Sequence, residues 1–495
     1  MPPSRKFGMS LRYFFLAFFI FLLIPPFFYN SPQEGLDNSW NIAIDLAYKY
    51  NLQFGKDFVF TYGQRGFLNA RLPIAINQFV YLVFDIFFLF NLFIILKEVF
   101  KEHFNYGSVL FIFLSIMLAQ YGGIYQWYFF FFYFFLFSFL KTPGRKDYLF
   151  YAALLSVLSF YFKVSLGISA VFIFLLAVHY ALLRKKINVK PYALILSSYF
   201  ACVWLGSRLL HVNLKGYLTA SLRFIDGYND AMFRTIDDKL VLYLYGAVLI
   251  ILIIVCWIAY LLLTAIREGE LARQFDRFFI YALIALGIFV LFKSSFVRSD
   301  TNLFLFFQYI GLFAVLLYLH GPSGLSRKIA ASCCWFILII SAWAVNTIPP
   351  SYKPYLRVAN LSFIPIKIGE IGNYLSQLGS YHRASADSDS LEFRDNKYKE
   401  VIGNRSVDIV PSEISRIYFN GLHYNPRPVI QSYAAFDKYL DGLNYQKYIS
   451  AGAPDFILFS VESIDDRFPF LMKQKLKWLY SAITKWPEGS VMTCY

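Results

Sequence analysis

The segment WYFFFFYFFLFSFL, residues 127–140, is built almost entirely from aromatic and aliphatic side chains, and FFLAFFIFLLIPPFF at residues 14–28 is similar. Of the 495 residues, 58% are hydrophobic and 21% are aromatic, whereas an ordinary soluble domain is about 45–50% apolar. A helix that crosses a bilayer needs about 20 mostly apolar residues. The sequence therefore predicts a mostly α-helical, polytopic membrane protein. We expect its Phe-rich runs to face lipid.

No small-residue cleavage site follows the first apolar run, so we interpret that run as an uncleaved helix rather than a signal peptide. Two of the predicted spans, 107–119 and 148–161, are short, and each could instead form a re-entrant pair with its neighbour. In all, the sequence predicts about eleven spans, at 13–29, 73–96, 107–119, 124–140, 148–161, 164–183, 191–207, 240–265, 278–292, 303–319 and 329–347.

The orientation follows from Lys and Arg in the short loops, which are enriched on the cytoplasmic side. With the N-terminus inside, the inner loops hold 17 Lys and Arg in 57 residues, and the outer loops hold 12 over a longer total length. We therefore expect the N-terminus inside and the C-terminus outside. The inner loops also hold 6 acidic residues, so they carry +11 of the net charge of +15. This topological origin of the charge argues against a nucleic-acid partner.

The chain divides into two parts: residues 1–347 form the predicted membrane bundle, and residues 348–495 are a polar tail. The tail contains strand-like runs, RSVDIVP and PDFILFS, and a helix-like run, FDKYLDGLNYQKYIS, so we expect a small external α/β domain. Two outer loops are long, 30–72 and 208–239. The first contains an amphipathic helix pattern that we expect to lie along the membrane surface, with Asp37 or Asn38 as its N-cap. The second is predicted to be a polar loop.

Acidic side chains follow the first span. Glu34 and Asp37 stand in EGLD. Asp37 could simply cap a helix, or either carboxylate could act as a general base at the membrane boundary. A third acid, Asp85, lies within the second span, and we favour structural pairing with another helix over a functional role for it.

Cationic side chains gather at the predicted outer ends of several spans, where topology gives no reason for positive charge. Lys163 stands in YFKVSLG, and Lys293, Arg298 and Asp300 stand in LFKSSFVRSD. Together they predict a site for a phosphate or diphosphate head group, although lysines at such positions can also snorkel to the interface. Arg65, in the turn FTYGQRGFL, is a weaker candidate for an anion contact.

The second long loop holds RFIDGYNDAMFRTIDD, in which Asp226 and Tyr228 are candidates for substrate contact. Their spacing does not fit an EF-hand. Nucleotide-binding glycine motifs, HExxH and GxSxG are absent from the sequence, so neither nucleotide-driven nor zinc chemistry is indicated. No cofactor is predicted with certainty, and a divalent cation is possible.

These features together resemble the membrane-embedded type C glycosyltransferases, a superfamily that places an acidic residue in the first long external loop. The stretch GLDNSWNIAIDLAYKYNLQFGKDFVFTYGQRGFL, residues 35–68, looks like a motif of bacterial proteins of this type, with Gln64-Arg65 replacing an expected Pro-Leu pair. FKSSFVRSD, GYNDAM, PRPVIQSYAAFDKYLDGLN and APDFILFS look like the same group. The same stretch contains Asp57 and Tyr62, which we add as substrate-binding candidates.

The resemblance implies a sugar donor linked to polyprenyl phosphate and an envelope glycan, lipid or protein as the acceptor. It also implies a bacterial inner membrane location with the tail outside. Under it, Asp37 or Glu34 would be the base, and Lys163, Lys293 or Arg298 would stabilise the leaving phosphate. Three alternatives remain open: an envelope polysaccharide polymerase or ligase of another type, a transporter or lipid flippase, and a non-catalytic assembly protein.

Overall fold

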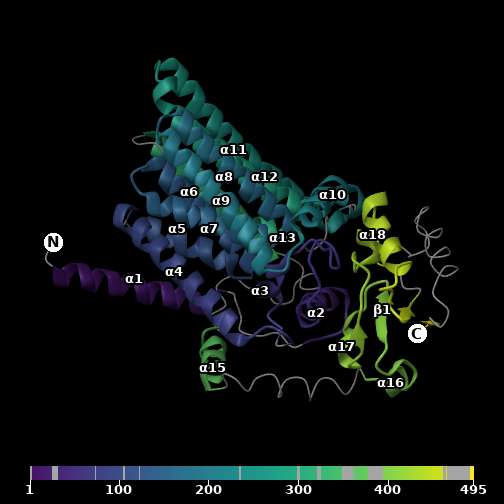
Figure 1. Cartoon of the computed structure of the whole chain (residues 1–495). Helices are drawn as coiled ribbons and strands as arrows, with labels where there is room; N and C mark the ends of the chain where they lie inside the picture. The colour runs from purple at the N-terminus through teal and green to yellow at the C-terminus, as the bar shows by residue number, and fades with distance from the viewer. Residues whose placement is uncertain are drawn as a thin grey trace.

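The computed structural model contains a helix bundle, a smaller domain with a parallel sheet, and the first long loop between them (Figure 1). The structure describes residues 3–24, 32–72, 74–103, 106–121, 123–232, 236–297, 302–319, 325–347, 361, 363–376, 394–460, 464 and 491–494.

Each of the eleven apolar segments predicted to span the membrane coincides with a helix. Six of the described helices are long and apolar enough to cross a membrane by length and composition: α4, α8, α9, α11, α12 and α14. This is consistent with a multi-pass membrane protein, while the number of spans and their orientation remain predictions. The bundle consists of α1 (Pro3–Leu23), α4 (Gln78–His103), α5 (Tyr106–Leu118), α6 (Ile124–Lys141), α7 (Lys146–Phe160), α8 (Val164–Leu183), α9 (Val189–Leu209), α11 (Val241–Arg267), α12 (Leu271–Phe296), α13 (Leu303–Leu319) and α14 (Leu325–Thr347).

The Phe-rich run that begins at Trp127 does not face lipid. Helix α6 is buried over nearly its whole circumference, and its Phe and Tyr rings pack on one another and on Phe313 of α13. The expectation of a lipid-facing run was therefore wrong for α6, since a helix that is apolar all round can also be the centre of a bundle. It fits α1 better, where Phe15 is 60% exposed and Phe19 is 42% exposed.

Helix α1 diverges from the other bundle helices, and its N-terminal end points away from them (Figure 1). Its C-terminal end contacts α15 (Phe363–Ser376). The ammonium of Lys367 on α15 donates to the carbonyl oxygens of Phe21 and Ile24. These are among the carbonyl groups that the end of a helix leaves without intrahelical partners, so Lys367 closes the end of α1.

Asp85 is paired, as its position predicted. Arg71, which follows α3 (Phe67–Ala70), makes a two-pronged ion pair with Asp85 of α4, with Nη1 3.0 Å from Oδ2. Both side chains are almost fully buried, and Tyr81 lies against the guanidinium. The pairing neutralises the buried charge, so Asp85 has a structural role.

The first long loop folds into α2 (Leu36–Lys49), the short 3-10 helix η1 (Gln64–Gly66) and α3. The N-cap of α2 is Gly35, with φ 107° and no side-chain cap of its own, so the expectation of Asp37 or Asn38 as the cap was wrong. Ile42 and Ile44 are fully buried, because α2 lies between the bundle and the small domain (Figure 1). The expected position of α2 along the membrane surface stays a prediction.

The second long loop was predicted to be a polar loop, and this was wrong as well. Most of it forms α10 (Leu214–Met232), followed by the 3-10 helix η3 (Asp238–Leu240). Tyr217, Ala220 and Phe224 are buried at helical spacing. Ala220 and Phe224 pack with Val59 and Val429 in a small second core that joins α10 to the C-terminal domain.

The C-terminal domain is α/β, as predicted. Its strands β1 (Ser406–Val410), β2 (His423–Tyr424), β3 (Phe456–Phe459) and β4 (Val491–Cys494) form one parallel sheet in the order β2-β1-β3-β4. The helices are α16 (Asn396–Ile402), α17 (Ser415–Phe419) and α18 (Lys438–Tyr448), with a 3-10 turn η4 (Ser432–Ala434). The two strand-like runs are β1 and β3, and the helix-like run is α18.

A buried ion pair organises this domain. Arg427 Nη1 lies 3.0 Å from Asp408 Oδ2 in β1, and Tyr448 Oη donates to the same oxygen at 2.6 Å. The guanidinium also donates to the carbonyls of Ile409, Pro411 and Ile430. Through these bonds, the segment PRPVIQS, residues 426–432, forms part of the core of the domain.

We predict a cytoplasmic N-terminus and an external C-terminal domain from the loop charge bias. A phosphatase that works only outside the cytoplasm, fused after residue 350, should be active, and a reporter that works only inside should be silent there. The opposite pattern would contradict the orientation. It would also place Asp37 and Lys163 on the wrong side for a donor lipid flipped to the outer leaflet.

Candidate functional site

Asp37 stands in the first turn of α2 with an exposed side chain. Its Oδ1 accepts a hydrogen bond from the indole Nε1 of Trp40, at 3.1 Å. A carboxylate in the first turn is favoured by the helix dipole. The exposed carboxylate is therefore held by one neighbour and remains accessible to a ligand.

Trp40 connects this carboxylate to the turn FTYGQRGFL. Its indole stacks on the ring of Tyr62 with centroids 4.6 Å apart and planes 16° apart, and it lies 5.5 Å from the ring of Phe60. Tyr62 in turn meets Tyr125 of α6 edge-on, at 5.8 Å. The three elements α2, the turn and α6 thus meet through a continuous run of aromatic rings.

Lys163 lies at the other end of this run. It is the extended residue before α8, and it forms an antiparallel bridge with Tyr62. Its Nζ is 3.2 Å from Tyr125 Oη and 3.4 Å from Tyr62 Oη, and it lies over both rings. Among the described residues, no carboxylate pairs with this ammonium, so its charge is free to attract an anion.

Backbone hydrogen bonds hold the turn against the segment before α8. Gly63 N donates to Phe162 O at 2.9 Å, Arg65 N to Tyr161 O at 2.7 Å, and Val164 N to Thr61 O at 3.0 Å. A Cβ atom on Gly63 would lie 2.5 Å from Tyr161 O. Position 63 therefore requires glycine because the two backbones touch there.

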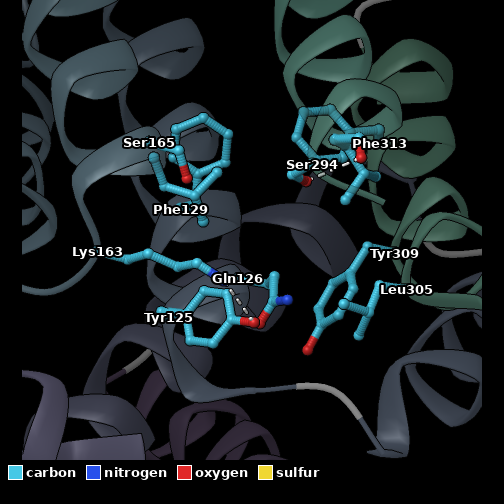
Figure 2. Close-up of a pocket in the computed structure, with 11 residues that line it drawn as sticks. Tyr125, Gln126, Phe129, Lys163, Ser165, Ser294, Leu305, Tyr309 and Phe313 are labelled. Atoms are coloured by element: carbon cyan, nitrogen blue, oxygen red, sulfur yellow. Dashed lines mark hydrogen bonds between the residues drawn. The ribbon is translucent and has the colours of Figure 1, made fainter. Parts of the chain in front are cut away.

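A cavity opens beside Lys163 (Figure 2). Lys163 and Tyr125 reach into it from one side, and Tyr309 and Leu305 of α13 lie opposite (Figure 2). The N-terminus of α8 borders the cavity, and this end of a helix favours anions. Its lining is Tyr125, Gln126, Phe129, Lys163, Ser165, Leu166, Leu291, Ser294, Leu305, Tyr309 and Phe313.

Gln126 adds a side-chain oxygen that no described residue bonds. It is 6% exposed, and its Oε1 makes no hydrogen bond with any described residue. An orphaned buried oxygen is costly, and a ligand or water in the cavity could satisfy it. The cavity therefore combines one ammonium, a helix N-terminus, hydroxyl groups and a largely apolar wall.

The structure does not bring the other predicted phosphate-binding residues into the described cavity lining. Lys293 is half-buried on α12, one residue before Ser294, but it does not line the cavity. Arg298 and Asp300 lie outside the described residues. The convergence of Lys163, Lys293 and Arg298 on one phosphate therefore stays a prediction.

Arg65 packs its guanidinium over the rings of Phe67 and Phe84, at 5.7 and 5.4 Å. Burial lowers the pKa of Arg65 from its ordinary value. No described carboxylate pairs with it, so Arg65 is a second candidate for an anion contact, separate from the cavity lining.

The remaining candidates lie elsewhere. Asp57 accepts from Gln53 N at 3.1 Å within its own turn. Asp226 is exposed on α10, and Tyr228 is on the same helix with a side chain outside the described set. Glu34 precedes α2, and its carbonyl oxygen accepts from Asn38 Nδ2 at 2.9 Å.

Asp45 of α2 was not among the sequence candidates. It is fully buried, and neither carboxylate oxygen has a hydrogen bond of good geometry to a described residue. Burial raises the pKa of Asp45 well above its usual range, against a smaller lowering by the backbone N–H groups of Ala75 and Ile76. The carboxyl group therefore favours its protonated form in the folded protein.

Asp45→Asn should make the protein more stable than the wild type at high pH. A folded state with a raised carboxyl pKa binds more protons than the unfolded chain, so wild-type stability falls as pH rises above the unfolded-state pKa of about 3.9. The amide of the variant does not titrate, so the variant does not lose stability in this way. The melting temperatures of the purified wild type and of Asp45→Asn should be measured at pH 5 and pH 8. The variant's advantage over the wild type should be larger at pH 8. A difference between the two proteins that does not change with pH would contradict the raised pKa of Asp45.

Metal binding receives no support from the described residues, among which no three His, Cys, Asp or Glu side chains come together to hold an ion.

No family model matches the chain, and no curated protein or solved structure is detectably similar to it. The functional argument accordingly rests on the geometry around Asp37 and Lys163.

Proposed function

We propose that this protein is an integral-membrane glycosyltransferase that moves a sugar from a polyprenyl-phosphate donor to an envelope glycan, lipid or protein at the outer membrane face. One observation carries the proposal. An exposed carboxylate, Asp37, and an ammonium that no described carboxylate pairs with, Lys163, flank one run of stacked rings, Trp40 and Tyr62.

The proposed reaction uses the two charged groups for opposite tasks. An acceptor hydroxyl has a pKa far above 7, so the Asp37 carboxylate would take its proton as the oxygen attacks the anomeric carbon. A new bond forms between that oxygen and the carbon. The bond from the anomeric carbon to the phosphate oxygen breaks, and its electron pair leaves with the lipid phosphate.

Lys163 is suited to receive this leaving group. The phosphate gains negative charge as its bond to the sugar breaks, and a fixed cation nearby lowers the energy of that state. The N-terminus of α8 adds a favourable dipole.

The rings of Trp40, Phe60 and Tyr62 lie between the two charged groups. Phe60 and Tyr62 are buried, at 7% and 9% exposure, whereas Trp40 is partly exposed. Trp40 is therefore the ring of this run that would contact the C–H face of a pyranose. A transporter is less well supported, because the intramembrane acid Asp85 is neutralised by Arg71 and supplies no free charge for a transport pathway.

The proposal is tested by transfer in proteoliposomes. Purified protein is supplied with polyprenyl-phosphate-linked sugars extracted from host membranes and with host envelope fractions as acceptor. Sugar should leave the lipid and appear in the acceptor, with stoichiometric release of polyprenyl phosphate. If no donor in the extract is consumed while a known transferase consumes its own donor in parallel, the proposal is wrong.

A further inference from the structure

Glu413 reaches from the C-terminal domain to the helix that carries Asp37. Its Oε1 accepts from Gly35 N at 3.0 Å and from Ser39 Oγ at 2.8 Å, and it also accepts from Ser415 Oγ. Ser415 N donates to Ser39 Oγ at 3.2 Å. Three donors from two distant parts of the chain thus meet at one carboxylate oxygen.

This contact ties the start of α2 to the C-terminal domain. The N-cap residue Gly35 has no side chain to cap the helix. Glu413 instead accepts from the backbone N–H of Gly35 and from the hydroxyl of Ser39 in the first turn, and its negative charge suits the positive end of the helix dipole. Asp37 stands two residues from Gly35 and two from Ser39, between the two residues that donate hydrogen bonds to Glu413.

The position of Glu413 follows from the sheet. It lies three residues beyond the end of β1, and α17, which follows it directly, packs against α2. In parallel sheets the carboxyl ends of the strands are the usual place for functional side chains. Here Glu413, beyond the carboxyl end of β1, contacts the first turn of α2.

We propose that Glu413 is a positioning residue for the reaction: it fixes the first turn of α2, so that the Asp37 carboxylate is held in place beside Trp40 and Tyr62. This role rests on the proposed function above. It makes the C-terminal domain part of the working site, although none of its residues need touch the substrate.

The domain has other attachments, so removing Glu413 should not detach it. Val59 N donates to Pro428 O at 2.8 Å, and Tyr50 Oη donates to Leu422 O at 3.3 Å. Phe224 of α10 also packs against Phe436 of the domain. A Glu413 variant therefore tests the local hold on α2 rather than the presence of the domain.

The test compares Glu413→Ala with Glu413→Gln and with Asp395→Ala as the control. Asp395 is an exposed acid of the same domain that caps only its own helix, α16. Glu413→Ala should lower kcat about 10-fold or more with little change in KM, because small misplacements of a reacting group are costly. Glu413→Gln keeps an acceptor oxygen and should restore part of the loss, and Asp395→Ala should leave kcat unchanged.

Two readouts separate positioning from general damage. In an Asp37→Asn background, Glu413→Ala should cause no further loss of kcat, whereas a structural defect would multiply the loss. Hydrogen exchange at residues 36–40 should speed up in Glu413→Ala and not in Asp395→Ala. This second readout needs no activity, so it decides the hold on α2 even if the wild-type protein transfers no sugar. Unchanged exchange at residues 36–40, or a kcat loss that persists in full without Asp37, would overturn the proposal.

Discussion

Asp37→Asn is expected to lower turnover about 10²-fold or more, because an amide cannot accept the proton of the acceptor hydroxyl. Asn is nearly the same size, and its amide oxygen can still accept the indole N–H of Trp40, which Asp37 Oδ1 now accepts at 3.1 Å. The variant should therefore reach near-normal abundance in the membrane. Sugar transfer per molecule of membrane-inserted protein is the quantity to measure.

Glu34→Gln is the paired control, because Glu34 is the other acid before α2. A small effect of Glu34→Gln beside a large effect of Asp37→Asn would assign the base to Asp37. The reverse result would move the base to Glu34 and keep the reaction. Full transfer by both variants would falsify the acid–base mechanism.

Lys163→Met should cause a loss of similar size, about 10²- to 10³-fold in kcat, as for removal of one group that stabilises developing charge. Methionine roughly preserves the length and apolar contacts of the side chain. No ion pair with a described residue is broken, because the Lys163 ammonium lies against the hydroxyls and rings of Tyr62 and Tyr125. Folding should therefore change little, and Lys163→Arg, which keeps the charge, should retain part of the activity.

Lys215→Met is the matched control, since Lys215 is an exposed lysine on α10. It should transfer sugar at the wild-type rate. If Lys163→Met does so as well, the cavity beside α8 does not hold the leaving phosphate, and the donor site must be sought near Arg65 or Lys293.

The helices of the bundle were predictable because lipid and core both demand long apolar segments. What the sequence could not show is which of those segments lie inside. WYFFFFYFFLFSFL has the composition of a lipid-facing helix, yet α6 packs in the centre, since apolar composition suits either environment. In contrast, the helical spacing of Tyr217, Ala220 and Phe224 was readable, and attention to it would have predicted α10.

The site was only partly predictable for a different reason. Asp37 and Lys163 could be identified because they are charged residues next to predicted outer ends of spans, where membrane topology does not require a charge. Their connection through Trp40, Tyr62 and Tyr125 depends on pairings between residues far apart in sequence. The bond between Glu413 and Ser39, 374 positions apart, is a stronger case, because nothing in either local pattern points to the other.

The most direct test of the proposed transfer reaction is the envelope glycan profile of cells that lack the gene, complemented with the wild type or with Asp37→Asn at equal membrane abundance. The account predicts that one glycan structure is lost or shortened on deletion, returns with the wild type and stays absent with Asp37→Asn. A deletion profile identical to that of the parent would contradict the transfer reaction, and full restoration by Asp37→Asn would contradict the assignment of Asp37 as its base.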